Sequence, residues 1–187
     1  MSAGVYVALL RGINVGGANK LAMGDLKAIF EGAGCSRVQT IIQSGNVVFA
    51  APAALLGDLA GIVAADIKRR FGVETPVILR SGAEMRAILA SNPFLRAGVD
   101  PALLHVMCLA SRPSREQIGA LDPNRSPPDE FVVRGKDIYL HLPNGVARSK
   151  LTNVYFDRTL RTIGTARNWR TMTKLCVAAE HCAARTE

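Results

Sequence analysis

The chain has 187 residues, of which 49% are hydrophobic and 20% charged, and its formal net charge at pH 7 is +8. This composition is typical of a globular protein and excludes a disordered one. At this length roughly 70% of the unfolded chain's surface can be buried, so the fold needs no disulfide or metal to hold it together. The first apolar run is too short for a signal peptide or a membrane span, and we therefore expect a cytoplasmic location.

Apolar periodicity and turn residues predict the elements of the first half. We expect strands at residues 5–10, 38–42, 46–49 and 76–79, and helices at residues 23–32 and 55–67. The unbroken apolar run of the first strand indicates burial on both of its faces. The order strand, helix, strand, strand, helix, strand is the split βαβ arrangement of ferredoxin-like folds.

The second half repeats this order as far as its last helix. Capping boxes open a helix at Ser81 and a short helix at Ser114. We expect strands at residues 103–109, 131–134 and 138–142, and helices at residues 151–163 and 170–184. The sequence therefore predicts an α+β fold of two ferredoxin-like halves with mostly antiparallel sheets. The halves cover residues 1–92, connecting helix included, and 101–187, and they form either two domains or one compact unit.

A basic stretch near the C-terminus holds most of the net charge. Residues 148–174 contain seven Lys or Arg residues, one acid and the only tryptophan, so they carry +6 of the formal charge of +8. A localised positive field around an aromatic ring favours the docking of an anion. The alternative is a solvated helix face, because Lys150, Arg158 and Arg161 fall on one side of the helix predicted at residues 151–163.

The segment 165–171 is the more specific part of this stretch. Arg167 offers a forked donor, Asn168 an amide and Trp169 a surface for stacking, and Arg148 and Lys150 add further cations. If Thr171 caps the terminal helix, the first amides of that helix add donors in the same place. The alternative is a core tryptophan with arginine stems packed over it.

A glycine-rich loop between the first strand and the first helix is the second candidate. Its site residues are Arg11, Asn14, Gly16, Gly17 and Lys20. Such a loop can wrap backbone amides around an anion, but its spacing matches neither a P-loop nor a dinucleotide fingerprint. The alternative is a structural loop whose glycines supply positive φ angles.

The next turn, with Ser44 and Asn46, is a weaker candidate, and its alternative is an ordinary hairpin turn. We expect no metal and no cofactor, because the cysteines and histidines lack metal-ligand spacing. The motif contexts of serine and cysteine hydrolases are also absent, which argues against classical hydrolase chemistry.

Four segments of the chain resemble the bacterial family catalogued as domain of unknown function 1697. They are residues 9–17 with Lys20, residues 43–49, residues 148–151 and residues 165–171. The resemblance implies an α+β fold with ferredoxin-like parts. It implies no activity, substrate or catalytic residue.

The leading hypothesis is a metal-free binding protein for a phosphate-bearing ligand, either a nucleic acid or a nucleotide-like molecule. The basic residues and the glycine-rich loop would line one cleft if the halves pack together. With 5% aromatic residues, a sheet that stacks RNA bases is disfavoured. The competing hypothesis is an enzyme for a small anionic metabolite that uses Ser44, Asn46 or Lys150. A third is a protein-interaction module whose basic stretch meets an acidic partner. The sequence leaves the oligomeric state open.

Overall fold

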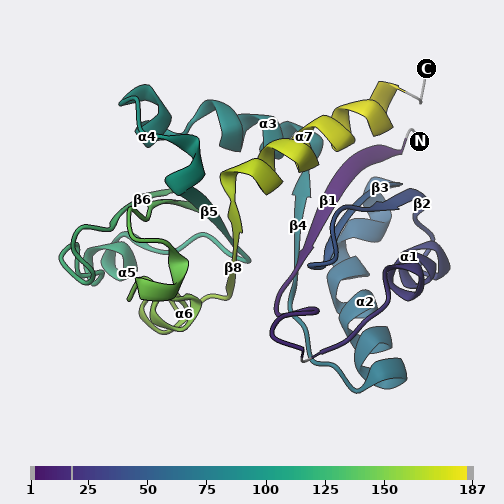
Figure 1. Ribbon diagram of the computed structural model, residues 1–187. Helices are drawn as coiled ribbons and strands as arrows, with labels where there is room; N and C mark the ends of the chain where they lie inside the picture. Colours follow the sequence, from purple (N-terminus) through teal and green to yellow (C-terminus); the bar gives the residue numbers. More distant parts are fainter. Residues whose placement is uncertain (1–2, 18, 185–187) are drawn as a thin grey trace. The chain divides into compact units, whose positions relative to one another are not determined.

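The computed structural model describes residues 3–17 and 19–184, which fall into two compact units. The first unit contains the described residues up to Arg86 together with those from Lys174 onward, and the second contains Ala87–Thr173. Each unit is described by itself (Figure 1). The domain boundaries expected from the sequence, residues 1–92 and 101–187, stay a prediction.

The first unit contains a four-stranded sheet in the order β2-β3-β1-β4, in which all neighbours are antiparallel. Its elements are β1 (Gly4–Leu10), α1 (Met23–Gly32), β2 (Ser36–Thr40), β3 (Asn46–Ala51), the 3-10 turn η1 (Ala53–Leu55), α2 (Leu56–Phe71) and β4 (Val77–Ser81). This order is that of a ferredoxin-like βαββαβ unit, as the sequence predicts.

The core of the first unit lies between its sheet and the helices α1 and α2, which cover one face of the sheet (Figure 1). Phe30 of α1 and Phe49 of β3 meet there with ring centroids 5.2 Å apart. In β1 the side chains from Val7 to Leu10 are fully buried although they alternate between the two faces. The prediction that this strand is covered on both faces is therefore confirmed.

The second unit repeats the topology with a sheet in the order β6-β7-β5-β8, again antiparallel throughout. Its elements are α4 (Pro93–Arg96), the 3-10 turn η2 (Pro101–Leu103), β5 (Leu104–Leu109), α5 (Arg115–Gly119), β6 (Glu130–Arg134), β7 (Asp137–His141), the 3-10 turn η3 (Val146–Arg148), α6 (Asn153–Leu160) and β8 (Gly164–Asn168). Two helices, α3 (Gly82–Ala90) and α7 (Trp169–Ala184), have residues in both units.

The structure corrects the sequence prediction at the C-terminal end of the second unit. Residues 164–168, for which no strand is predicted, form the edge strand β8, which pairs with β5. The helix predicted at residues 151–163 is shorter at both ends: α6 starts at Asn153 after the N-cap Thr152, and Arg161 ends it in the left-handed conformation with φ 51°. Lys150 lies two residues before the N-cap, so its predicted place on the helix face is wrong.

The start of α7 also differs from the prediction. The side-chain Oδ1 of Asn168, and not Thr171, caps the helix by accepting a hydrogen bond of 2.8 Å from the backbone N–H of Thr171. The two predicted capping boxes are confirmed, since Ser81 exchanges hydrogen bonds with Glu84 and Ser114 with Gln117. None of the described helices is long and apolar enough to cross a membrane.

Candidate functional site

Asn14 holds the glycine-rich loop of the first unit in place. It adopts a left-handed conformation with φ 54°, and its amide Nδ2 donates to the carbonyls of Leu21 and Gln43 at 2.9 Å each. Its Oδ1 accepts the backbone N–H of Leu21, also at 2.9 Å. One side chain thus joins the two ends of its own loop to the turn before β3.

The turn before β3 is held by Gly45 and Asn46. Gly45 has φ 71°, and its carbonyl accepts the backbone N–H of Leu10 at 2.7 Å. Asn46 is fully buried, and its Nδ2 donates to the carbonyl of Ile41 and to Oγ of Ser44. Ser44 and Asn46 therefore stabilise the turn that presents Gln43 toward the loop.

A pocket lies where the loop, this turn and the start of α1 meet. Its volume is about 520 Å³, and the lining residues are Asn14, Gly17, Lys20, Leu21, Ala22, Met23 and Gln43. Lys20 is exposed, and among the described residues no acid forms an ion pair with it. The N-cap position of α1 is Ala22, which has no side chain able to accept from the first amides of the helix. The pocket therefore combines a cation with an uncapped helix N-terminus.

In the second unit, the predicted site residues of β8 and α7 are already engaged in the fold. Arg167 is half-buried, and its Nη1 donates to Oγ1 of Thr165 at 2.8 Å and to the carbonyl of Ala166 at 2.9 Å. Burial lowers the pKa of Arg167 to about 10, so the guanidinium keeps its charge at neutral pH. The Asn168 side chain is occupied as the cap of α7, and Trp169 is half-buried.

Arg148 and Lys150 differ from these residues because both side chains are exposed. Arg148 ends the short turn η3, and the backbone N–H of Lys150 donates to Oγ of Ser126 at 2.9 Å. Ser126 in turn donates to the buried carboxylate of Asp129 at 2.7 Å. The backbone near Lys150 is thus fixed, while its ammonium group faces solvent.

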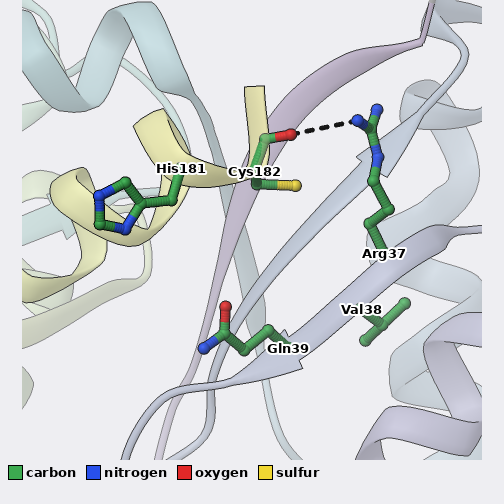
Figure 2. Close-up of a pocket in the computed structure, with 5 residues that line it drawn as sticks. All are labelled: Arg37, Val38, Gln39, His181 and Cys182. Carbon is green, nitrogen blue, oxygen red and sulfur yellow. Dashed lines mark hydrogen bonds between the residues drawn. The ribbon is translucent and has the colours of Figure 1, made fainter. Parts of the chain in front are cut away.

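A second pocket of the first unit, of about 320 Å³, lies between β2 and the last turn of α7 (Figure 2). The guanidinium of Arg37 points toward α7 and donates to the Cys182 carbonyl at 3.1 Å, while His181 is directed away from Cys182. Carbonyls at a helix C-terminus carry partial negative charge. This arrangement satisfies the end of α7 and disfavours an anion in the pocket.

A third pocket of about 460 Å³ in the first unit lies beside the start of α3, between small residues of β1, α3 and α7. Here the helix N-terminus is already closed, because the Glu84 carboxylate and Ser81 hydroxyl form its capping box. Arg86 lines the pocket as well, but the capping carboxylate competes with any added anion.

The structure thus brings together three of the predicted site residues of the first unit, Asn14, Gly17 and Lys20, in one pocket. Arg11 is tied to the start of β4 through its backbone and does not line that pocket. Arg148, Lys150, Arg167, Asn168 and Trp169 belong to the second unit. That these five residues line one cleft together with the glycine-rich loop stays a prediction.

Sequence reasoning missed Gln43 and Ala22 as residues of this pocket. Gln43 stands at the start of the segment 43–49, but its distance from the glycine-rich loop in space is not readable from the sequence.

Among the described residues, no group of three or more His, Cys, Asp or Glu side chains could hold a metal ion.

Comparisons with known proteins place the chain in a family. The structure is similar to that of SP0830, a conserved bacterial protein from Streptococcus pneumoniae, with a TM-score of 0.72 and 20% sequence identity over 95% of this chain and 99% of that chain. No curated protein matches the sequence. The model of the family described as protein of unknown function (DUF1697) matches residues 4–139, which include the glycine-rich loop and the turn before β3. The chain therefore belongs to this DUF1697 family of proteins of unknown function.

Proposed function

We propose that the first unit binds a small phosphate-bearing molecule in the pocket between the glycine-rich loop, Gln43 and the start of α1. The observation that carries this proposal is the meeting of the exposed Lys20 with the uncapped N-terminus of α1 in a pocket of about 520 Å³. Pockets of a few hundred cubic ångströms are the size that small metabolites occupy.

The electrostatics of this pocket favour an anion. The unsatisfied amides and the dipole of an α-helix give its N-terminus about half a positive charge, and α1 spans ten residues. Lys20 adds a full positive charge at the same pocket. Asp25, in the first turn of α1, acts in the opposite direction and limits the affinity.

The ligand's position follows from the polar groups around the pocket. Backbone amides at the start of α1 and the ammonium of Lys20 would bind the phosphate, since charge-assisted hydrogen bonds are the stronger kind. The side-chain amide of Gln43 would contact the rest of the molecule. Asn14 would act indirectly, because its own donors already join the loop to the turn.

A thermal-shift panel tests this proposal. The ligands are inorganic phosphate, ribose 5-phosphate, AMP and ATP, with adenosine and ribose as phosphate-free controls. A ligand that binds only the folded state raises the melting temperature. We expect a shift from at least one phosphate-bearing compound and none from its phosphate-free counterpart. Equal shifts from both, or no shift at millimolar concentrations, would refute the proposal.

Three variants locate the binding site. Lys20→Ala should weaken binding about tenfold or more, because it removes a charge-assisted contact. Asp25→Asn should strengthen binding, because it removes a negative charge from the first turn of α1. The matched control is Lys27→Ala, which removes an exposed lysine of α1 whose ammonium is 3.7 Å from Glu31. Calorimetric titration should show no change for this control.

A further inference from the structure

Several exposed cations of the second unit form no ion pair in the described part of the chain, and four of them lie between residues 148 and 161. These four are Arg148, Lys150, Arg158 and Arg161, and together they form what we call the basic segment. The acid within this segment, Asp157, accepts the backbone N–H of Gly164 at 2.9 Å through its Oδ1. Solvent ions or a binding partner must therefore neutralise the charge of the basic segment.

The exposed cations of α1 and α2 in the first unit show the usual arrangement. Lys27 pairs with Glu31, Lys68 with Glu74, and both Arg69 and Arg70 with Asp66. In the basic segment, by contrast, Arg158 and Arg161 stand three residues apart with like charge. Arg158, in the last turn of α6, and Arg161, its C-cap, lie where cations interact favourably with the helix dipole. Arg148 and Lys150 lie outside α6, so the stability of this helix does not explain their charge.

The chemistry of the surrounding surface favours a nucleic acid over a protein as the partner. Val146, Val154 and Ile163 are exposed by 59%, 52% and 44%, but single exposed apolar side chains are normal on a protein surface. A specific protein interface needs an apolar, desolvated centre. A phosphate backbone needs only cations. The buried Phe156 and Leu160 turn the apolar side of α6 into the core.

This surface also lacks the means to read bases. The ring of Tyr155 is covered by the guanidinium of Arg125, 4.9 Å from the ring centroid, and its hydroxyl accepts the N–H of Asp122 at 2.8 Å. Arg125 thus covers one face of the Tyr155 ring, and Phe156, the other aromatic residue of α6, is fully buried, so stacking on bases is disfavoured. Contacts made by Arg and Lys to phosphates carry no sequence information.

We propose that the basic segment binds the phosphate backbone of a nucleic acid without reading its sequence. The helix α6 extends for about 12 Å along the contact, since eight residues rise by 1.5 Å each. This site lies in the second unit, whereas the pocket described above lies in the first.

Fluorescence anisotropy with a labelled 20-base-pair DNA duplex of random sequence tests this proposal. If all four cations neutralise phosphates, the plot of log K against log salt concentration has a slope of about −3.6. Affinity then falls about a hundredfold between 50 and 200 mM salt. A second duplex of unrelated sequence should bind equally. No binding at 25 mM salt, or a strong preference for one sequence, would overturn the proposal.

The variant R148A/K150A/R158A/R161A should lose binding, and each single change, such as Arg158→Ala, should reduce the slope by about one unit. The matched control is K27A/K68A/R69A/R70A, which removes the same number of charges but takes them from cations paired with acids. This control should keep its slope. Equal losses in both quadruple variants would show that net charge, not the basic segment, causes binding.

A protein partner is distinguished by one further titration. Poly-glutamate of similar length, labelled in the same way, should bind more weakly than the duplex at equal salt. If poly-glutamate binds more tightly than the duplex, and R148A/K150A/R158A/R161A loses this binding, the partner is an acidic protein surface and not a nucleic acid. Single-site variants keep each test interpretable, because these side chains are exposed and their loss does not open the core.

Discussion

The two units share one topology but treat the start of their first helix differently. In the second unit a short connection leads from β5 to α5, and the Ser114 hydroxyl and the Gln117 amide close the helix N-terminus. In the first unit a longer loop leads from β1 to α1, and Ala22 leaves the same position uncapped. The length and sequence of the connection between the first strand and the first helix therefore decide whether the helix N-terminus is capped or opens into a pocket.

The loop that builds this pocket costs stability that a short connection does not. Gly12, Asn14, Gly16, Gly17 and Asn19 all have positive φ angles, a conformation that is unfavourable for most residues. Asn14 compensates with three side-chain hydrogen bonds, two to Leu21 at the end of the loop and one to Gln43 in the facing turn. Substitutions in the loop, the facing turn and the helix caps should therefore affect the two units differently.

The largest effect is expected from Gly45→Ala in the turn that faces the loop. A Cβ at this position would lie 2.9 Å from Cβ of Leu10 and 3.2 Å from Cβ of Ile13, and φ is 71°. The close contacts and the left-handed backbone together should cost about 3 kcal/mol of unfolding free energy. Urea denaturation measures this loss.

The matched control for Gly45→Ala is Gly61→Ala, in the middle of α2. A Cβ there would meet nothing within 4 Å. Alanine at this site should stabilise the helix by up to about 1 kcal/mol. If both alanine variants unfold at the same urea concentration, the account of the turn is wrong.

Asn14→Ala should have the next largest effect. It removes three hydrogen bonds of 2.9 Å and places alanine in a left-handed conformation, so we expect a loss of about 2 kcal/mol. Asn19→Ala is the matched control, since Asn19 shares the loop and the left-handed backbone but donates one side-chain hydrogen bond, to Gly12. Its loss should be smaller by about 1 kcal/mol. Equal losses for the two asparagines would contradict the bridging role of Asn14.

Exchanging the caps of the two units should produce opposite changes of about 1 kcal/mol each. Ser114→Ala opens the start of α5 and should destabilise the second unit, because it removes the accepting hydroxyl. Ala22→Ser should stabilise the first unit, because Ala22 already has the extended backbone of an N-cap residue. The new hydroxyl would also compete with phosphate for the amides of α1. If Ala22→Ser stabilises the first unit but leaves its affinity for phosphate unchanged, the amides at the start of α1 do not bind the phosphate.

The smallest effect is an alkaline loss of stability that begins in the first unit. Burial raises the pKa of the Cys35 thiol from 9.0 to about 11, and that of the Tyr139 hydroxyl in the second unit from 10.0 to about 12. Each raised pKa stabilises the fold fully below the unfolded value, and this contribution is lost as pH rises through the folded value. For Cys35 the loss should be below about 1 kcal/mol at pH 9.5. Urea unfolding at pH 7.5 and 9.5 measures it, and Cys35→Ala should lose less than the unsubstituted chain.

The fold could be predicted from the sequence where the local signals are strong. Apolar periodicity predicts the buried strand β1 and the bounds of α1. Capping chemistry predicts the helix starts at Ser81 and Ser114. The strand β8 was not predictable in this way, because Gly164–Asn168 contains no apolar alternation. It becomes a strand through its pairing with β5. Where the local preference for helix or strand is weak, tertiary contacts thus determine the secondary structure.

The candidate site shows the same limit. The glycine-rich loop and Lys20 are recognisable as a possible anion site from residue types alone. The role of Asn14 depends on the carbonyl of Gln43, 29 residues away, and no local pattern shows that contact. The engagement of Arg167 with Thr165 and the capping by Asn168 likewise depend on β8 and α7 being in place. These contacts use Arg167 and Asn168 within the fold, whereas Lys20 in the first unit stays exposed.

Nuclear magnetic resonance of the ¹⁵N-labelled protein shows which residues bind the best phosphate-bearing compound of the thermal-shift panel. We expect saturable shifts of the backbone amides of Gly17, Met23 and Gly24 and of the Gln43 side chain, with small changes elsewhere. Lys20→Ala should need about tenfold more ligand to reach the same shifts. Shifts confined to residues 148–161, with the amides of α1 unchanged, would contradict binding in the pocket of the first unit.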